Sequence, residues 1–291
     1  MPAIHLVTDT DASLPTDLET RYSIIQVPVT VHFGEETYRS NLDLDDVRLF
    51  ARIDREKQLP TTSAPSPGAF IEAFERSFQD GAKSVICFCV SSEVSATYSA
   101  ALTACQSLPS RDISVIDTRS LSMSQGFIVL AAAEAIAAGA SKEEAIARAL
   151  DVRDRTYLFA ALSTVKYLAM SGRVGSIAAG MASLLNVKPV LTIRNGKLDM
   201  LERVRTQTKS WKRTLELTSE ALAGRPIERL AIIHVAAKEA ALRFEALARK
   251  SLPCPDQAIL AELTPGLSVH SGAGLVGLVV VAVKRTIKGS I

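Results

Sequence analysis

The segment HSGAGLVG at residues 270–277 has the spacing G-x-G-x-x-G at Gly272, Gly274 and Gly277. Glycines at this spacing let a strand–helix turn approach the pyrophosphate of a dinucleotide, which then lies at the helix N-terminus. Such a turn requires a helix after it. Here LVVVAVK follows, a β-branched run that predicts a strand. The pattern therefore predicts a tight glycine turn that places His270 in a loop and lets the backbone approach a ligand closely.

Two further segments are rich in hydroxyl side chains. TTSAPSPGAF spans residues 61–70 and SSEVSATY spans residues 91–98. In the first, Ser66 is a predicted N-cap and Pro67 the first residue of a helix, and the second follows a predicted strand and begins the next helix. Helix N-termini at the carboxyl ends of strands favour anionic ligands. Two interpretations stay open at this point: ordinary helix caps, or an anion-binding site.

Motifs of several other catalytic classes are missing, since the sequence has no G-x-x-x-x-G-K-[ST], H-E-x-x-H or G-x-S-x-G. His5, His32 and His234 lie inside apolar strand-like runs, where we expect hydrogen-bonded core or strand-edge histidines. A small-molecule phosphotransferase or hydrolase, with Ser95 as nucleophile and His270 as base, is one alternative function. A regulatory module that senses a lipid and binds another protein is a second.

The composition is typical of an α/β protein, with 47% hydrophobic and 5% aromatic residues. A formal net charge of +2 argues against a broad nucleic-acid-binding face. No apolar run reaches the roughly 18–20 residues that span a bilayer, and the N-terminus lacks the pattern of a signal peptide, so we expect a cytoplasmic protein. The four cysteines match no zinc-site spacing, and we expect buried, reduced thiols and no metal site.

Predicted strands and helices alternate along the chain. In the first half we expect strands at 3–9, 24–33, 84–90 and 112–118, and helices at 44–57, 120–138 and 141–154. In the second half we expect a hairpin that turns at Asn195-Gly196, strands at 230–236, 258–263 and after Gly277, and helices at 209–223 and 238–250. This order predicts an α/β fold with helices on both faces of a sheet. We place the boundary between an N-terminal domain (1–155) and a C-terminal domain (156–291) near residue 155.

Seven short motifs occur in an order and spacing that resemble those of the DegV family along nearly the whole chain. They are TDTDASLP (8–15), TTSAPSPGAF (61–70), VSSEVSATY (90–98), VIDTRSLSMSQG (115–126), LAMSGRVGS (168–176), LLNVKPVL (184–191) and HSGAGLVG (270–277). Each motif is weak alone, but their common order makes the resemblance specific.

The resemblance implies a two-domain α/β protein, with an N-terminal parallel sheet, that binds one long-chain fatty acid in an apolar tunnel between its domains. It implies a carrier without a cofactor rather than an enzyme. Such a carrier presents the carboxylate to a separate ATP-dependent fatty acid kinase subunit for acyl-phosphate formation. By motif, the carboxylate contacts fall on Thr62, Ser95 and His270, with Ser63 and Ser92 as neighbours.

Two arginines match family positions that are linked to the partner protein or the acyl-phosphate. Arg173 lies in the S-G-R turn, and Arg205 follows the predicted hairpin. Arg205 belongs to a basic run that also contains Arg203, Lys209, Lys212 and Arg213. The run is either a solvated helix face or a surface that docks to an acidic kinase or, transiently, to an anionic membrane.

The sequence departs from the family's usual motifs mainly by exchanging one small or hydroxyl residue for another. The departures are Thr10, Ala64, Ala96, Thr118, Ser171 and Ala273. Because the hydroxyl groups implied for the site are retained, we expect the site to be retained as well. Ala96 adds a methyl group where the family has a glycine, next to the expected carboxylate.

Overall fold

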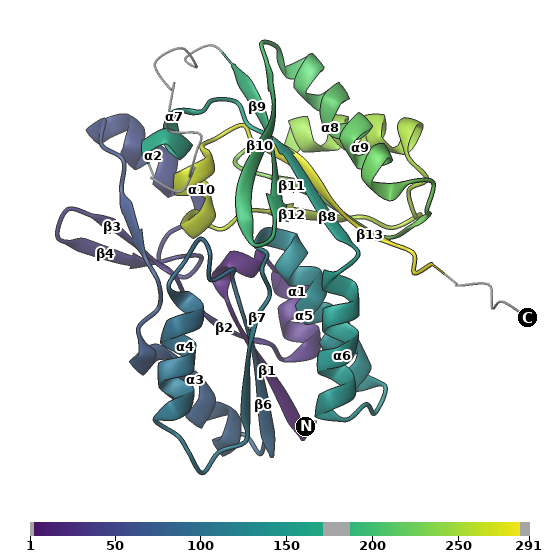
Figure 1. Ribbon diagram of the computed structural model, residues 1–291. Helices are drawn as coiled ribbons and strands as arrows, with labels where there is room; N and C mark the ends of the chain where they lie inside the picture. The colour runs from purple at the N-terminus through teal and green to yellow at the C-terminus, as the bar shows by residue number, and fades with distance from the viewer. Residues whose placement is uncertain (1–2, 171–186, 286–291) are drawn as a thin grey trace, which may run out of the picture.

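The computed structural model describes residues 3–170 and 187–285. Within these residues the strands form a four-stranded, a six-stranded and a three-stranded sheet. In Figure 1 the four-stranded sheet occupies the lower half of the molecule and the six-stranded sheet the upper half. The α/β fold predicted from the alternation of strands and helices is confirmed.

The four-stranded sheet has the order β2-β1-β6-β7 and is parallel throughout, as predicted for the N-terminal half. Its strands are β1 (Ile4–Asp9), β2 (Ile25–Val27), β6 (Ser84–Cys89) and β7 (Ile113–Asp117). Successive side chains of a strand point to opposite faces. Leu6 and Phe88 accordingly pack with α5 (Ser122–Ala137), whereas Val7 and Cys87 pack on the face of α3 (Pro67–Gln79) and α4 (Thr97–Gln106). Both faces are buried, and the strands therefore read as continuous apolar runs.

The six-stranded sheet has the order β10-β9-β8-β13-β11-β12. Its strands are β8 (Thr156–Ala161), β9 (Lys188–Arg194), β10 (Lys197–Val204), β11 (Ile227–His234), β12 (Ile259–Glu262) and β13 (Val276–Ala282). The predicted hairpin joins β9 to β10 through Asn195 and Gly196, both with positive φ (52° and 83°). Helices α8 (Gln207–Leu222) and α9 (Lys238–Ser251) cover the face of the sheet that is turned away from α5.

Helix α5 lies between the two larger sheets and joins their cores. Residues 122–133 are all buried, which fits a sequence that is almost apolar around the whole helix. Its side chains share one hydrophobic cluster with Leu6 and Phe88 of the first sheet and with Leu158 and Val279 of the second. Helix α6 (Lys142–Arg153) packs beside α5, and α1 (Thr16–Tyr22) adds Leu18 to the same cluster. The domain boundary that we propose near residue 155 falls between α6 and β8.

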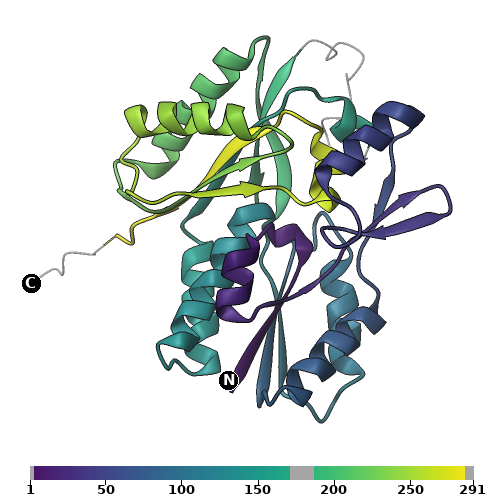
Figure 2. The same ribbon diagram turned by 180° about the vertical axis from the view of Figure 1, so that it is seen from behind.

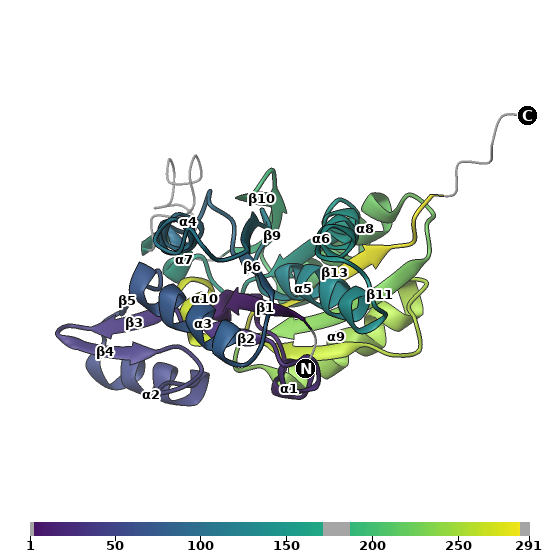
Figure 3. The same cartoon turned by 90° about the horizontal axis from the view of Figure 1, so that it is seen from below.

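The three-stranded sheet joins sequence-distant segments beside the larger sheets. Its order is β4-β3-β5, with β3 at Thr30–Phe33, β4 at Glu36–Arg39 and β5 at Thr61–Ser63. Its core also includes side chains of α2 (Asp46–Glu56), α7 (Lys166–Met170) and α10 (Pro265–Ser271). Figures 2 and 3 show α10, from the end of the chain, beside β3, β5 and α2 from its beginning.

Two expectations about secondary structure are wrong. The predicted strand at 24–33 is two strands, because Pro28 lies between β2 and β3 and the chain passes there from the first sheet to the third. His270 is not in a loop: it lies in the last turn of α10, which Pro265 opens and Gly272 (φ 78°) ends. Seven residues are too few for a hydrophobic period to show, which is why the helix escaped prediction.

Candidate functional site

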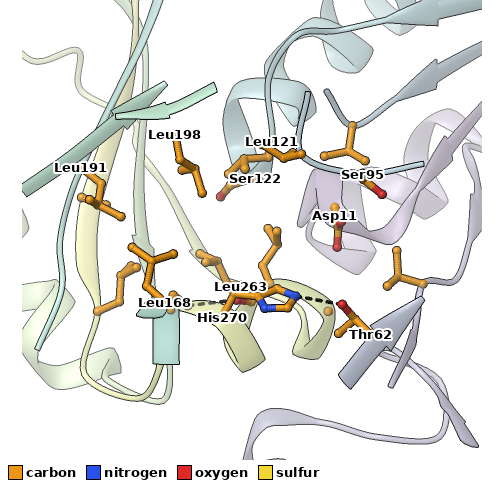
Figure 4. A pocket seen from close by; sticks show the side chains of 18 of the residues that line it. Asp11, Thr62, Ser95, Leu121, Ser122, Leu168, Leu191, Leu198, Leu263 and His270 are labelled. Atoms are coloured by element: carbon orange, nitrogen blue, oxygen red, sulfur yellow. Dashed lines mark hydrogen bonds between the residues drawn. The ribbon is translucent and has the colours of Figure 1, made fainter. Parts of the chain in front are cut away.

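A narrow pocket lies where the three-stranded sheet, α10 and the six-stranded sheet meet the N-terminus of α5 (Figure 4). The empty space between its lining atoms, taken together with its open mouth, is about 840 Å³, and about 90 Å³ of this can hold the centre of a water molecule. Such a slot suits a thin chain better than a bulky ring. Its apolar wall includes the buried side chains of Leu158, Leu191, Ile233, Leu263 and Leu275.

The polar residues of the lining are Asp11, Thr62, Ser63, Ser95, Ser122, His270 and Ser271. In Figure 4, Thr62 and Ser95 lie on the side opposite Leu191 and Leu198. Thr62, Ser95 and His270 are half-buried, whereas Leu191 is buried. The pocket therefore offers hydrogen-bonding groups on the side of Thr62 and Ser95 and hydrocarbon on the side of Leu191 and Leu198.

The centre of the polar end is a hydrogen bond of 2.8 Å between Thr62 Oγ1 and His270 Nε2. Thr62 is the middle residue of β5 and pairs with Val31 of β3. Because side chains alternate along a strand, Thr62 points to the face of this sheet that packs against α10. The hydroxyl and the imidazole both donate and accept hydrogen bonds, and together they can bind a carboxyl group without a buried arginine.

Helix α10 is tied to the N-terminal half through alternate residues. Besides His270, the bonds join Thr264 Oγ1 to the Thr10 carbonyl (3.0 Å), the Gly266 N–H to Ser40 Oγ (3.0 Å), and Ser268 Oγ to Asp46 Oδ2 (2.8 Å). A Cβ at Gly266 would lie 2.8 Å from Asp11 Oδ1, so only glycine allows this approach. Burial raises the pKa of Asp46 to about 7, although the hydrogen bond from Ser268 lowers it. These contacts fix the position of His270.

Ser95 reaches the pocket from the loop before α4. Its Oγ lies 2.8 Å from Thr97 Oγ1 and accepts a hydrogen bond from the Thr97 N–H at 3.3 Å. Ser95 therefore bonds to the first residue of α4 and also lines the pocket. Ala96 is exposed and does not line the pocket.

The two neighbouring serines take different positions. Ser63 lines the pocket, but its hydroxyl lies 2.9 Å from His32 Nε2 on the other face of the small sheet. Ser92 is exposed and outside the pocket lining, where its hydroxyl donates to Asp117 Oδ2 at 2.6 Å. The structure thus brings Thr62, Ser63, Ser95 and His270 to one pocket and leaves Ser92 beside it.

Asp9 holds the loops that form the polar end. This fully buried carboxylate accepts hydrogen bonds from the N–H groups of Val90 (2.7 Å) and Asp11 (3.0 Å) and from Gln125 Nε2 (3.2 Å). Burial raises its pKa to about 6, although these hydrogen bonds act in the opposite direction. Asp9 therefore connects the end of β1 to the serine loop after β6 and to the first turns of α5.

The three glycines of the G-x-G-x-x-G pattern contact protein and do not line the pocket, contrary to our expectation of close approach to a ligand. Added Cβ atoms would meet the ring of Tyr167 at Gly272, Ser163 Cβ (3.1 Å) at Gly274 and the Phe159 carbonyl oxygen (2.6 Å) at Gly277. Gly277 lies inside β13, so a strand follows the turn, as predicted. The pattern is explained by packing rather than by a dinucleotide.

The two arginines expected at a partner surface are not among the described residues that line the pocket. Arg173 belongs to residues 171–186, which lie outside the described residues. Arg205 is exposed, directly after β10, and does not line the pocket. In the basic run around it, Arg213 pairs with Glu202 at 2.7 Å and Lys212 with Glu216 at 3.7 Å, so part of its charge is neutralised.

Comparison with known proteins identifies the family. The model of the family described as "Uncharacterised protein, DegV family" matches residues 3–283. The chain belongs to the DegV family. A DegV domain-containing protein of Streptomyces coelicolor is 32% identical over 277 residues, which cover 95% of this chain and 98% of the relative.

Solved DegV structures share the fold over nearly the whole chain. A fatty acid-binding DegV family protein from Thermus thermophilus superposes with a TM-score of 0.88 at 30% identity, covering 97% of this chain and 100% of that one. DegV of Bacillus subtilis, a fatty acid-binding protein, gives a TM-score of 0.84 at 30% identity and covers 98% and 100%. The resemblance inferred from the seven motifs is therefore confirmed.

Some pocket residues of this DegV family member were not predicted from its sequence. Asp11 and Ser122 belong to two of the seven motifs, but nothing in those motifs indicates that they line a pocket. The apolar lining comes from many separate strands, such as Leu158 from β8, Leu191 from β9 and Ile233 from β11. Sequence reasoning could not single these residues out, because every buried strand supplies similar side chains.

The remaining histidines and cysteines lie apart from the pocket lining. His5 and His234 are buried, and burial lowers the pKa of each. All four cysteines are free thiols, and those of Cys87 and Cys89 lie 3.7 Å apart on one face of β6. Within residues 3–170 and 187–285, no three His, Cys, Asp or Glu side chains are placed to bind a metal. None of the helices in these ranges has the length and apolar character needed to cross a membrane.

Proposed function

We propose that this protein binds a long-chain fatty acid in the narrow pocket, with the carboxyl group at Thr62, Ser95 and His270. The observation that carries the proposal is the Thr62–His270 hydrogen bond on one side of a mainly apolar slot. A fatty acid has the same division, one polar group on a long hydrocarbon chain. Two solved relatives at 30% identity are fatty acid-binding proteins, which supports the same ligand class here.

The tail supplies most of the affinity in this proposal. Burial of hydrocarbon contributes about 0.8 kcal/mol per CH₂, whereas a hydrogen bond to a charged group contributes about 1.5–3 kcal/mol. A dozen methylenes therefore outweigh the head group. The hydroxyl and imidazole groups instead set the direction of the chain. The carboxyl group gives up hydrogen bonds to water when it enters the pocket, and these protein groups replace them.

We further propose that the protein acts as a carrier, which presents the carboxylate to a separate ATP-dependent fatty acid kinase subunit. The exposed Arg205 and the partly neutralised basic run beside it offer a surface for an acidic partner or, transiently, for an anionic membrane. Arg173 is part of the same proposal, because it matches a family position that is linked to the partner protein or the acyl-phosphate. No cofactor enters this scheme: the fatty acid is the ligand.

The hydrolase or phosphotransferase alternative requires Ser95 to be activated by His270. In the structure Ser95 Oγ has Thr97 Oγ1 as its partner at 2.8 Å, and His270 Nε2 has Thr62 Oγ1. A serine nucleophile is expected to lie within hydrogen-bond reach of its base. The observed pairing therefore favours ligand binding at these residues over nucleophilic attack by Ser95. A regulatory module that senses a lipid would use the same pocket.

Mass spectrometry of the natively purified protein, with calorimetric titration of the lipid-free protein, tests the binding proposal. We expect a co-purified fatty acid, and saturable binding of palmitic acid after its removal. The double variant Thr62→Val/Ser95→Ala should bind palmitic acid at least about tenfold more weakly, because the carboxyl group loses hydrogen bonds while the tail stays buried. A protein that stays indifferent to added fatty acids would refute the proposed function. Unchanged binding by the double variant would refute the site alone.

A further inference from the structure

Ser122 carries a hydroxyl group that the fold leaves without a hydrogen bond. The residue is 0% exposed, and within the described residues its Oγ has no partner. It nevertheless lines the proposed fatty acid pocket. A buried hydroxyl without a partner costs roughly 1–3 kcal/mol, so its presence at a pocket wall indicates that a ligand atom supplies the missing bond.

The backbone at Ser122 also departs from ordinary geometry. Its φ is +54°, in the left-handed region that residues other than glycine rarely adopt. Leu121, the preceding N-cap of this 16-residue helix, is extended and makes no side-chain hydrogen bond to the first turn of α5. The Ser122 hydroxyl at the start of α5 is thus a polar point in the pocket wall, and it favours an oxygen atom of the ligand.

The place of Ser122 along the pocket distinguishes it from the carboxyl-binding residues. In Figure 4 its oxygen lies on the side of Leu198, away from the Thr62–His270 pair. An acid bound by Thr62 and His270 that extends toward Leu191 would pass Ser122 soon after its carboxyl group. Ser122 thus faces the early part of the hydrocarbon chain, where an unsubstituted fatty acid offers only methylene groups.

We propose that Ser122 makes the pocket selective for fatty acids that carry a hydroxyl group near the carboxyl end. This inference rests on the proposed function and narrows its ligand class. A ligand hydroxyl would donate to or accept from Ser122 Oγ and remove the unpaired polar group. A plain methylene chain leaves the hydroxyl unpaired, and sites built to hydrogen-bond a ligand hydroxyl discriminate against ligands that lack it.

Calorimetric titration of the lipid-free full chain with palmitic acid and its 3-hydroxy derivative tests this proposal. We expect the hydroxylated acid to bind about tenfold more tightly to the wild type. Ser122→Ala should remove this preference without weakening the binding of palmitic acid. Ser122→Gly should do the same and suits the left-handed backbone, so a folding defect in the alanine variant would not hide the effect.

Ser124 provides a matched control on the same helical turn. Its hydroxyl is also buried and has no partner within the described residues, but it does not line this pocket. Ser124→Ala should therefore keep the preference for the hydroxylated acid.

Each other outcome counts against the proposal in its own way. Equal binding of both acids by the wild type would overturn the inference and leave fatty acid binding intact. Equal weakening of both acids in the Ser122 variants would overturn it as well, because Ser122 would then bind the carboxyl group. If neither acid binds, the proposed function fails and the inference fails with it.

Discussion

Thr62 and His270 are 208 positions apart in the chain, and a hydrogen bond of 2.8 Å joins their side chains. Each residue is held by contacts of its own element. Thr62 is fixed by the pairing of β5 with β3, and His270 by the bonds that tie α10 to Thr10, Ser40 and Asp46. The polar end is therefore preformed, and a carboxyl group that enters it meets groups whose orientation is already set.

Replacing Thr62 by valine keeps the shape of the side chain and removes its hydroxyl. We expect palmitic acid to bind about tenfold more weakly, because the carboxyl group loses one charge-assisted hydrogen bond. Calorimetric titration measures this change. Thr61→Val is the matched control, since Thr61 is exposed on the neighbouring position of β5 and does not line the pocket. Equal affinities of the two variants would contradict the role of Thr62.

Replacing Gly277 by alanine should destabilise the fold. Its Cβ would lie 2.6 Å from the Phe159 carbonyl oxygen and 2.7 Å from Ala160 Cα, both backbone atoms of β8. We expect a loss of stability of about 1–3 kcal/mol, since β8 and β13 must separate to admit the methyl group. Thermal unfolding measures it. Gly68→Ala is the control, because its Cβ would make an ordinary 3.6 Å contact with Ser66 Oγ. Similar unfolding temperatures for both variants would refute the packing explanation.

The sequence predicted elements whose patterns are complete within their length. Helix α5 has 16 residues and a long apolar run, whereas the β-branched run of β13 is enough for a strand, which needs only about 4–8 residues. Asn195-Gly196 marks its hairpin by turn chemistry alone. The prediction of a single strand at 24–33 was wrong because one proline, Pro28, interrupts an otherwise continuous strand pattern. Helix α10 was not predicted because it is only seven residues long and is stabilised by tertiary contacts.

The candidate site was predictable only where a motif named a residue. Thr62, Ser63, Ser95 and His270 were implied by the resemblance of the hydroxyl-rich loops and the glycine turn to family motifs, and the structure gathers them in one pocket. Ser92 belongs to the same loop as Ser95 but turns to Asp117 instead. Which hydroxyl of a loop enters a pocket depends on local backbone angles, and a motif does not encode them.

Asp46 should make the stability of the protein depend on pH. Burial raises the pKa of its carboxyl group to about 7 in the folded state, from an ordinary value of 3.8 in the unfolded chain. Between these values the unfolded chain releases the proton and the folded protein keeps it, so stability falls as pH rises from about 4 to 7. The difference of about three pKa units corresponds to at most about 4 kcal/mol.

Asp46→Asn should remove this penalty, because an amide oxygen still accepts the hydrogen bond from Ser268 and carries no charge. We expect the variant to gain stability over the wild type as pH rises from 5 to 8, measured as the free energy of unfolding in urea. Asp9, whose pKa is also raised, to about 6, contributes equally to both proteins. The control is Asp45→Asn at the exposed N-cap of α2. Parallel pH profiles for Asp46→Asn and wild type would exclude the effect.

Arg205 should matter for transfer and not for binding. It is exposed after β10 and outside the pocket lining. We expect Arg205→Ala to bind palmitic acid like the wild type and to lower the rate of acyl-phosphate formation by a cognate kinase about three- to tenfold, by loss of one charge contact. Lys83→Ala, at an exposed cation just before β6, should leave both measurements unchanged. An equal loss of binding and transfer in Arg205→Ala would argue against a partner contact.

Leu191 should set the length of the chain that the pocket accepts. It is 5% exposed in β9, and in Figure 4 it lies at the far side of the pocket from Thr62 and His270. Leu191→Phe fills this end, and a tail that loses contact at two methylenes loses about 1.6 kcal/mol, or about tenfold in affinity. We therefore expect palmitic acid to bind about tenfold more weakly and decanoic acid to bind as before, in calorimetric titrations. Leu191→Met conserves volume and should leave both affinities close to wild type. Equal weakening of the two acids by Leu191→Phe would show that the tail does not extend toward Leu191.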